Sequence, residues 1–230
     1  MKVLIIVTNI AMYENKTLTT GLWLSELTHF YHSASEQGYE ITIASPQGGY
    51  TPIDPESLKP MMLDKLSKEY HANENFMKLL QNTKSLTDVA GQHFDVVYLT
   101  GGHGTMYDFP NNTTLQDIIR VHYENNKIVS AVCHGVGGLL NVRLSNGEYL
   151  IKGKTITGFN WFEESLARRK KEVPFNLEAA LKKRGSNYKK AFIPMTSKVV
   201  ADGNLITGQN PFSSKEIAKA VMKYLKKRAL

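Results

Sequence analysis

The sequence predicts a doubly wound α/β sandwich, in which helices cover both faces of a mostly parallel sheet. Short apolar segments alternate along the chain with amphipathic ones. The first four apolar segments run nearly uninterrupted in Val, Ile, Leu and Ala, and such runs are typical of strands that are buried on both faces of a parallel sheet. Alternation of these strands with helices is typical of α/β folds.

The apolar segments place six expected strands, at residues 3–7, 41–44, 96–100, 128–133, 155–159 and 205–207. Amphipathic segments and their flanking turn residues place helices at 22–37, 74–81, 113–123 and 213–227. Two long stretches, at about 46–92 and 161–190, are predicted to be excursions from the sheet that overhang a site. A chain of 230 residues is short enough for all of it, residues 1–230, to form one domain.

The charge pattern argues against a nucleic-acid partner. The formal net charge is +7, and the excess comes from short basic runs at 168–171, 182–184, 189–190 and 226–228. These runs alternate with apolar residues at helical spacing, so we interpret them as solvated helix faces. Neither a recognised binding module nor interleaved aromatic residues accompany them, although nucleic-acid binding usually adds one of the two.

The remaining bulk properties indicate a protein of the reducing cytoplasm. No run of about 18 apolar residues exists, so no membrane-spanning helix and no membrane partner are expected. The apolar start of the chain is better explained by a first core strand than by a signal peptide. Cys133 is the only cysteine, so an internal disulfide is impossible and a reducing compartment fits.

Cys133 is the most informative residue of the chain. The apolar segment 128–133 ends abruptly in Cys133-His134-Gly135, a pattern that predicts a strand, a sharp turn and the start of a helix. The positive end of a helix favours thiolate over thiol, and His134 can supply a base or a cation. The pattern therefore predicts a cysteine-nucleophile enzyme, although a buried structural cysteine is the alternative because free cysteines are commonly buried.

A second strand end carries the glycine-rich segment Gly101-Gly102-His103-Gly104. Ligands of open α/β sheets bind at the carboxyl ends of the strands, and a thiolate that attacks a carbonyl group needs donors for the developing oxyanion. We predict that the N–H groups of Gly102 and His134 are these donors. Gly101, His103 and Gly135 complete the predicted substrate-binding set; an ordinary glycine turn is the alternative interpretation.

The base is expected to be His134. None of the seven histidines follows position 134, so a mechanism that needs a histidine from the last third of the chain is excluded. His93 and His122 are expected at the surface. A weaker hypothesis is a structural metal site at His29, His32 and Glu36, which are spaced i, i+3 and i+7 on one predicted helix.

Three acids are candidates for work beside Cys133 and His134. Glu163 and Glu164 follow the predicted strand at 155–159, and either could orient a histidine base; both could instead be glutamates at the start of a helix. Glu26 lies among large apolar residues in the middle of a predicted helix. If it is desolvated, its pKa rises and it can share a proton with the thiol; the alternative is a position on the wet face of that helix.

Four segments together resemble the ThiJ/PfpI superfamily. They are residues 21–27, 99–104, 131–135 and 202–211. The pair Gly48-Gly49 and the long excursion that follows it resemble the heat-shock chaperone and glyoxalase III branch. The resemblance covers nearly the whole chain and implies a flavodoxin-like fold and, commonly, a homodimer.

The resemblance also assigns roles to individual residues. Cys133 matches the nucleophile, His134 its partner, and Glu26 the carboxylate near the sulfur. The third member of the triad best matches Glu164, with Glu163 as the neighbour that is not dismissed.

The branch resembles enzymes of the glyoxalase III (D-lactate dehydratase) type, which convert methylglyoxal and related dicarbonyls to 2-hydroxy acids without glutathione. No metal, nucleotide or other cofactor is implied. The alternatives are a protein deglycase, a stress-responsive holdase for unfolded protein clients and a thiol redox sensor. A cysteine protease ranks lower.

Overall fold

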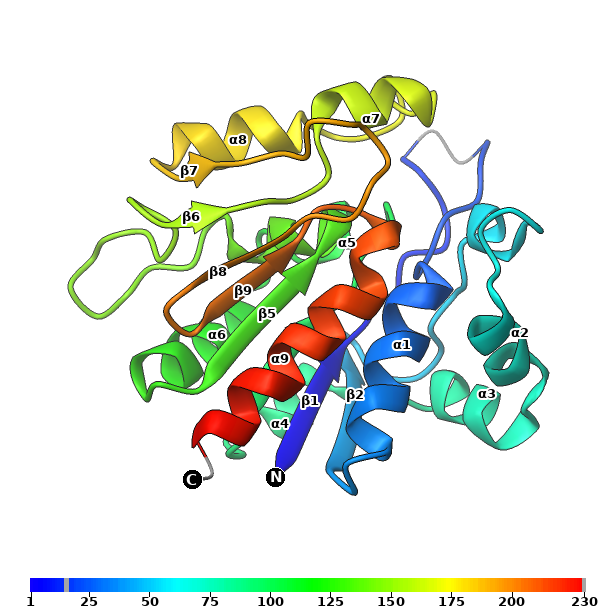
Figure 1. Cartoon of the computed structure of the whole chain (residues 1–230), viewed down its shortest axis with the longest axis horizontal. Coiled ribbons are helices and arrows are strands. Elements are labelled where there is room, and N and C mark those ends of the chain that lie inside the picture. Colours follow the sequence, from blue (N-terminus) through cyan, green and yellow to red (C-terminus); the bar gives the residue numbers. More distant parts are fainter. Residues whose placement is uncertain (15–16, 229–230) are drawn as a thin grey trace.

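The computed structural model describes residues 1–14 and 17–228. A seven-stranded sheet in the order β3-β2-β1-β4-β5-β9-β8 runs through its centre (Figure 1). All neighbouring strands are parallel except β8 and β9. The strands of this sheet are β1 (Lys2–Ile6), β2 (Glu40–Ser45), β3 (Lys84–Ser85), β4 (Val96–Leu99), β5 (Ile128–Val132), β8 (Val199–Asp202) and β9 (Leu205–Gly208).

Helices cover both faces of the sheet. Helices α1 and α9 lie on one face, and α4 and α6 lie on the other (Figure 1). The α-helices are α1 (Leu24–Ser35), α2 (Lys65–Ala72), α3 (Glu74–Gln81), α4 (Leu86–Val89), α5 (Thr105–Asp108), α6 (Thr113–Glu124), α7 (Trp161–Leu166), α8 (Leu177–Lys183) and α9 (Ser214–Arg228). Three 3₁₀ helices join them: η1 (Pro55–Leu58), η2 (Cys133–Leu139) and η3 (Pro211–Ser213).

The central strands are buried on both faces, as their composition predicts. Every residue of β4 and β5 is buried, and successive side chains point into two separate apolar clusters, one on each face of the sheet. Within the larger sheet, the order β2-β1-β4-β5-β9 is that of a flavodoxin-like fold. The predicted α/β class is therefore confirmed.

The prediction was wrong at one strand and missed three, namely β3, β7 (Asn187–Tyr188) and β8. The segment expected at 155–159 forms only the two-residue strand β6 (Thr155–Ile156), which pairs with β7 outside the main sheet. Strand β3 lies within the stretch that we interpreted as an excursion, and β8 forms the antiparallel edge. A two-residue strand gives too short a pattern to detect, and β8 is only half-buried.

Part of each excursion lies beside Cys133: residues 59–62 of the first and residues 166–169 of the second line the same cavity as this cysteine. The first contains η1, α2 and α3 and is joined to the segment before α1 by two backbone hydrogen bonds, Leu22 N–H to Pro52 O and Asp54 N–H to Leu22 O. The second contains α7, α8 and β7. No helix within residues 1–14 and 17–228 combines the length and the apolar character that crossing a membrane requires.

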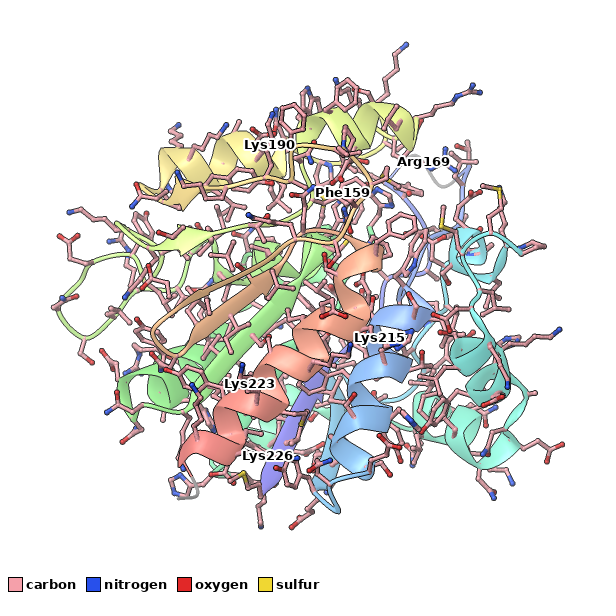
Figure 2. The ribbon with its side chains drawn as sticks, viewed as in Figure 1. Phe159, Arg169, Lys190, Lys215, Lys223 and Lys226 are labelled. Carbon is pink, nitrogen blue, oxygen red and sulfur yellow. The ribbon has the colours of Figure 1, made fainter. Side chains whose placement is uncertain are left out.

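The basic residues of the last helix lie on a solvated face, as the charge pattern predicts. Figure 2 shows Lys215, Lys223 and Lys226 along α9, and all three are exposed. The opposite side of α9 packs against α1 and the sheet, where Ile217 and Val221 are fully buried.

Candidate active site

Cys133 lies at the bend between β5 and η2. Its φ angle is 56°, in the left-handed region that residues with a Cβ rarely adopt. Strained residues of this kind cluster at functional sites because the surrounding structure must hold them there. The predicted sharp turn is therefore present, although it leads into a 3₁₀ helix.

His134 connects Cys133 to an acid on α7. Its Nδ1 atom lies 3.3 Å from Cys133 Sγ, and its Nε2 atom lies 2.8 Å from Glu164 Oε2. The second oxygen of Glu164, Oε1, lies 2.8 Å from Nε2 of His103. One carboxylate thus binds two imidazole rings, whose centroids are 4.1 Å apart.

The Glu164 contacts define the protons on both rings. Burial alone would raise the pKa of Glu164, but the charge of His134 and hydrogen bonds from both histidines hold that pKa well below its usual range. Because a carboxylate only accepts hydrogen bonds, each Nε2 atom must carry a proton. The neutral form of His134 then presents the lone pair of Nδ1 to the sulfur, as a general base requires.

His103, the second histidine bound to Glu164, is held in its neutral form. Burial and the neighbouring His134 lower the pKa of His103. The sequence correctly placed this residue in the site, but its contact with Glu164 had no signal in the sequence.

Glu26 approaches Cys133 from α1. Its side chain is fully buried, and Oε2 accepts a 2.6 Å hydrogen bond from Gly101 N–H. Burial raises the pKa of Glu26 to about 8, although hydrogen bonds with Cys133 and Gly101 partly oppose the shift. The carboxyl group therefore keeps its proton at neutral pH, as expected for a desolvated acid. The alternative of a wet helix face is wrong.

The α1 backbone is fixed at this point by Tyr98 from β4. The Tyr98 hydroxyl donates a hydrogen bond to the backbone oxygen of Glu26, and the Tyr98 ring stacks on Phe30 with centroids 3.7 Å apart. These contacts hold the acid at its position beside the sulfur.

The expectation that the thiolate form of Cys133 is favoured is wrong for the resting site. Burial raises the pKa of the Cys133 thiol well above its usual range, and Glu26 raises it further once the carboxyl group ionises. Hydrogen bonds from the N–H groups of His134 and Gly102 to the sulfur offset part of this effect. The site therefore stores a protonated thiol, and a base must remove its proton.

The sequence predicted these same two N–H groups as oxyanion donors. Both point at the sulfur, so an oxygen on a carbon bound to that sulfur lies within their reach. Gly102 has φ +98°, and a Cβ there would lie 2.0 Å from Gly21 O. Only glycine fits this close approach.

Gly101 and Gly135 have other functions than substrate contact. Gly101 N–H is already occupied by Glu26, so this residue positions the acid. A Cβ on Gly135 would lie 2.1 Å from Thr100 O. Gly135 therefore permits η2 to pack closely against the end of β4.

Glu163 and Glu164 are adjacent in sequence but make separate contacts. Glu163 Oε1 accepts hydrogen bonds of 2.8 Å from Met195 N–H, Gln209 Nε2 and Asn210 Nδ2. It holds the segment around Met195 against α7 and makes no hydrogen bond to a histidine in the described residues. The geometry thus favours Glu164 as the orienting acid.

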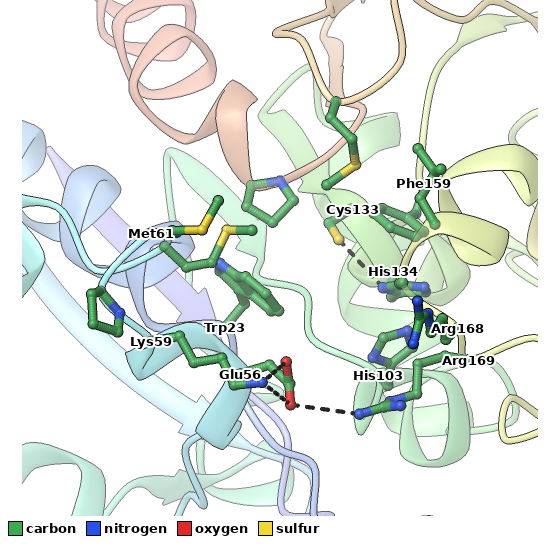
Figure 3. Close-up of a pocket in the computed structure, with 16 residues that line it drawn as sticks. Trp23, Glu56, Lys59, Met61, His103, Cys133, His134, Phe159, Arg168 and Arg169 are labelled. Carbon is green, nitrogen blue, oxygen red and sulfur yellow. Dashed lines mark hydrogen bonds and ion pairs between the residues drawn. The ribbon is translucent and has the colours of Figure 1, made fainter.

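A cavity of about 730 Å³ opens above Cys133. Figure 3 shows His134 and His103 on one side of it and Trp23 on the other, with Cys133 between. Methionine, proline and aromatic side chains form most of the remaining wall. Although Cys133 is only 2% exposed, its sulfur is therefore reachable from the cavity.

The described residues contain one group whose side chains could hold a metal ion, namely His103, His134 and Glu164, with ligand atoms within 4.8 Å of one another. These atoms already satisfy one another as hydrogen-bond partners. The metal site considered at His29, His32 and Glu36 does not form, because His29 binds Asp64 and His32 contacts Tyr70 and Glu36.

Comparison with known proteins identifies the family of this chain. Residues 17–224 match the sequence model of the DJ-1/PfpI family. The chain belongs to the DJ-1/PfpI family. This result confirms the resemblance to the ThiJ/PfpI superfamily that the four sequence segments indicated.

Relatives in the family come from fungi and bacteria. Glyoxalase 3 of Candida albicans is 34% identical over 88% of this chain and 89% of its own. The crystal structure of glyoxalase III from Candida albicans has a TM-score of 0.87 at 34% identity and covers 96% of each chain. The structure of Rapid Encystment Protein 24 KDa of Francisella tularensis has a TM-score of 0.91 at 39% identity, covering 96% of this chain and 97% of its own.

Proposed function

We propose that the protein is a glutathione-independent glyoxalase of the glyoxalase III type, which converts methylglyoxal and related 2-oxoaldehydes to 2-hydroxy acids. The observation that carries the proposal is a single reachable thiol in contact with one general base and one general acid. His134 is oriented by an ionised Glu164, and Glu26 is a protonated acid. The names of the relatives that align over most of the chain support the same reaction.

The first step is addition of the thiol to the aldehyde. His134 Nδ1 removes the proton from Cys133 Sγ, and Glu164 stabilises the imidazolium that forms. The sulfur then bonds to the aldehyde carbon, whose oxygen becomes an alkoxide near the N–H groups of Gly102 and His134. Glu26 gives its proton to this oxygen, and the product is a hemithioacetal.

The second step moves hydrogen between the two carbons. Glu26, now a carboxylate, removes the hydrogen of the former aldehyde carbon, while the imidazolium of His134 protonates the adjacent carbonyl oxygen. The resulting enediol accepts a proton at the second carbon from Glu26. Loss of the hydroxyl proton of the first carbon to His134 then gives a thioester of the 2-hydroxy acid.

Hydrolysis completes the cycle. Water attacks the thioester, and the sulfur leaves with the proton that His134 holds. The Glu26 carboxylate takes one proton of the attacking water, and the other proton stays on the released 2-hydroxy acid, so Cys133 and Glu26 return to their protonated forms. The net change is addition of one water to the dicarbonyl, without oxidation or reduction and without a step that needs an added thiol.

The experiment is turnover of methylglyoxal by the purified protein with no thiol and with a chelator present. Lactate formation is expected, and Cys133→Ser should abolish it while the protein stays folded by circular dichroism. Unchanged turnover in Cys133→Ser would contradict the proposal. A deglycase would use the same groups on methylglyoxal adducts, so adducts of free amino acids belong in the same assay.

A holdase function has one observation in its favour. Phe192 is 102% exposed and Ile193 is 61% exposed, and this apolar segment lies close to the part that Glu163 fixes to α7. Such apolar exposure is typical of interaction surfaces. The protein should still suppress the aggregation of a client protein after Cys133→Ser. It should suppress aggregation less well in the double variant Phe192→Ser, Ile193→Ser. Loss of this protection in Cys133→Ser but not in the double variant would contradict a holdase function.

We also propose that the protein is cytoplasmic and forms a homodimer. The isolated cysteine supports the first statement, since a reducing compartment suits a functional free thiol. Light scattering on the purified protein tests the second, and a monomeric mass would contradict it. A redox-sensor function is disfavoured, because a buried thiol with a raised pKa reacts slowly with peroxide.

A further inference from the structure

The cavity above Cys133 is much larger than methylglyoxal requires. Its volume is about 730 Å³, within the range of roughly 300–1,000 Å³ that is usual for pockets that take drug-sized ligands. Methylglyoxal is only a few times larger than a water molecule, which takes up ~30 Å³ in the liquid. The cavity therefore has room for a much longer substituent on the dicarbonyl.

The walls and the rim of the cavity differ in chemistry. Trp23 and Phe159 line the cavity with flat apolar surfaces, and Met61, Met62 and Met195 line it with adaptable ones. At the rim lie Lys59, Arg168 and Arg169 with a single acid, Glu56. The charged residues that line the cavity thus leave an excess of two positive charges at its mouth.

Most of the rim charges are already paired. Glu56 accepts hydrogen bonds of 2.8 and 2.7 Å from Lys59 Nζ and lies 3.6 Å from Arg169. Arg169 also lies over the ring of Tyr13, at 5.9 Å from its centroid. Figure 3 shows the contacts of Glu56 with Lys59 and Arg169 as dashed lines.

Arg168 is the exception. No interaction of its side chain with another described residue is present. The residue follows α7 with φ 58°, a position after a helix where glycine is the usual choice and a side chain carries a steric cost. Glu164 lies in that helix, so the backbone position of Arg168 is fixed relative to the orienting acid of the site. Figure 3 places Arg168 on the wall of His134.

We propose that the cavity binds 2-oxoaldehydes that have an apolar body and a terminal anionic group, and that Arg168 binds this anion. The inference rests on the proposed glyoxalase function and names its substrate class. The aldehyde end reaches Cys133, the body contacts the aromatic and methionine walls, and a carboxylate at the far end meets the guanidinium group. A guanidinium matches a carboxylate in shape and charge.

A pair of substrates of similar shape tests whether Arg168 binds an anionic group. Phenylglyoxal and 4-carboxyphenylglyoxal share the dicarbonyl and the ring and differ in one negative charge. The readout is the ratio of kcat/KM for the charged substrate to kcat/KM for the neutral one, at low and at high salt. We expect a ratio of about five in the wild type, which is the upper end for one partly exposed ion pair, and a smaller ratio at high salt.

Variants separate direct contact from the general field of a basic protein. Arg168→Gln should lower the ratio to about one, since that pair is lost, and Arg168→Lys should retain part of the preference. Lys171→Gln removes the same charge from a nearby exposed position that does not line the cavity, so it should keep the wild-type ratio. Equal loss in Arg168→Gln and Lys171→Gln would overturn the proposal.

Two kinds of failure are distinguishable. If methylglyoxal and phenylglyoxal are both turned over but 4-carboxyphenylglyoxal is no better, the inference about Arg168 is wrong and the glyoxalase function stands. If none of the three substrates is turned over, the proposed function fails and this inference falls with it.

Discussion

Glu26 and Glu164 approach the same cysteine site from two regions with opposite environments. Glu26 is buried with one backbone N–H and a sulfur as its partners, and its pKa rises to about 8. Glu164 is also buried, but two histidines surround it and hold its pKa well below its usual range. The comparison teaches that burial alone does not decide the charge of a carboxyl group; the available donors do.

The difference divides the chemistry between the two acids. A neutral carboxylic acid can give a proton to a substrate oxygen, whereas an ionised one can orient a histidine and stabilise its charge. Pairs of acids whose pKa values are pushed apart in this way are typical of acid–base catalysis. Each of the following experiments tests one side of that comparison.

The largest effect is expected from Glu26→Gln, which keeps the shape of the side chain but replaces its ionisable carboxyl group with an amide that cannot act as an acid or a base. Loss of a general acid–base group lowers kcat/KM by about a hundred- to ten-thousand-fold. In the wild type, kcat/KM should also fall as the pH rises above about 8, because Glu26 then loses its proton. A pH series of methylglyoxal turnover measures both, and an unchanged alkaline decline in Glu26→Gln would contradict the assignment.

Glu164→Gln tests the other region. The amide cannot accept hydrogen bonds from both His103 and His134, so one ring must change its tautomer or turn. We expect kcat/KM to fall by about a hundredfold or more, as when an orienting acid is replaced elsewhere. Nitrogen chemical shifts of the histidine rings report the tautomers directly. Activity loss with unaltered shifts would show that Glu164 acts in another way, and Glu164→Asp should restore part of the activity.

The raised pKa of Glu26 also makes folding stability depend on pH. The folded-state pKa of Glu26 is about 8, whereas the ordinary pKa of a glutamate is 4.5, so the unfolded chain loses this proton first as the pH rises. The stabilisation is therefore full below about pH 4.5 and is lost as the pH rises to about 8, by on the order of a few kcal/mol. Urea unfolding of wild type and Glu26→Gln at about pH 5 and pH 8 measures the difference between the two proteins.

That comparison has an internal control. Asp108 is also buried, and its pKa is raised to about 7, but it is present in both proteins. Its contribution therefore cancels. Parallel stability curves for the two proteins would count against a protonated Glu26.

The smallest effect on activity is expected from Glu163→Gln, the matched control for Glu164→Gln. Glu163 accepts three hydrogen bonds from the segments around Met195 and Gln209 and contacts neither histidine. We expect a loss of about 1–2 kcal/mol of stability, since hydrogen bonds to a charged group weaken, with little change in kcat. An activity loss as large as that of Glu164→Gln would mean that the two acids share one function.

Much of the central fold could be predicted from the sequence. The predicted bounds of β1, β2, β4, β5 and β9 lie within one or two residues of the observed ones, because strands of parallel sheets are nearly continuous runs of apolar residues. Short strands with partial burial give no such pattern. The length of strand β6 was overestimated because Phe159 lines the cavity and Asn160 caps α7, so neither residue continues the strand.

The site could be predicted only where it is local in sequence. Cys133 and His134 are adjacent, and the turn glycines mark the strand ends. The choice between Glu163 and Glu164 needed coordinates, because one position along a short helix turns the side chain by about 100°. His122 was expected at the surface, but it is buried and hydrogen bonded to Ile118 O and Phe94 N–H. A buried neutral imidazole with both nitrogens satisfied has no signature in a single sequence. The extent of the domain, residues 1–230, stays a prediction.

The left-handed backbone at Cys133 has a consequence for how the chain tolerates change. With φ at 56°, this position suits glycine, and any side chain there adds strain of about 1–2 kcal/mol. Cys133→Gly would remove that strain, but the same substitution would remove the sulfur. Selection for a more stable fold would therefore favour glycine at position 133 and abolish the reaction. Only selection for catalytic activity would retain cysteine there.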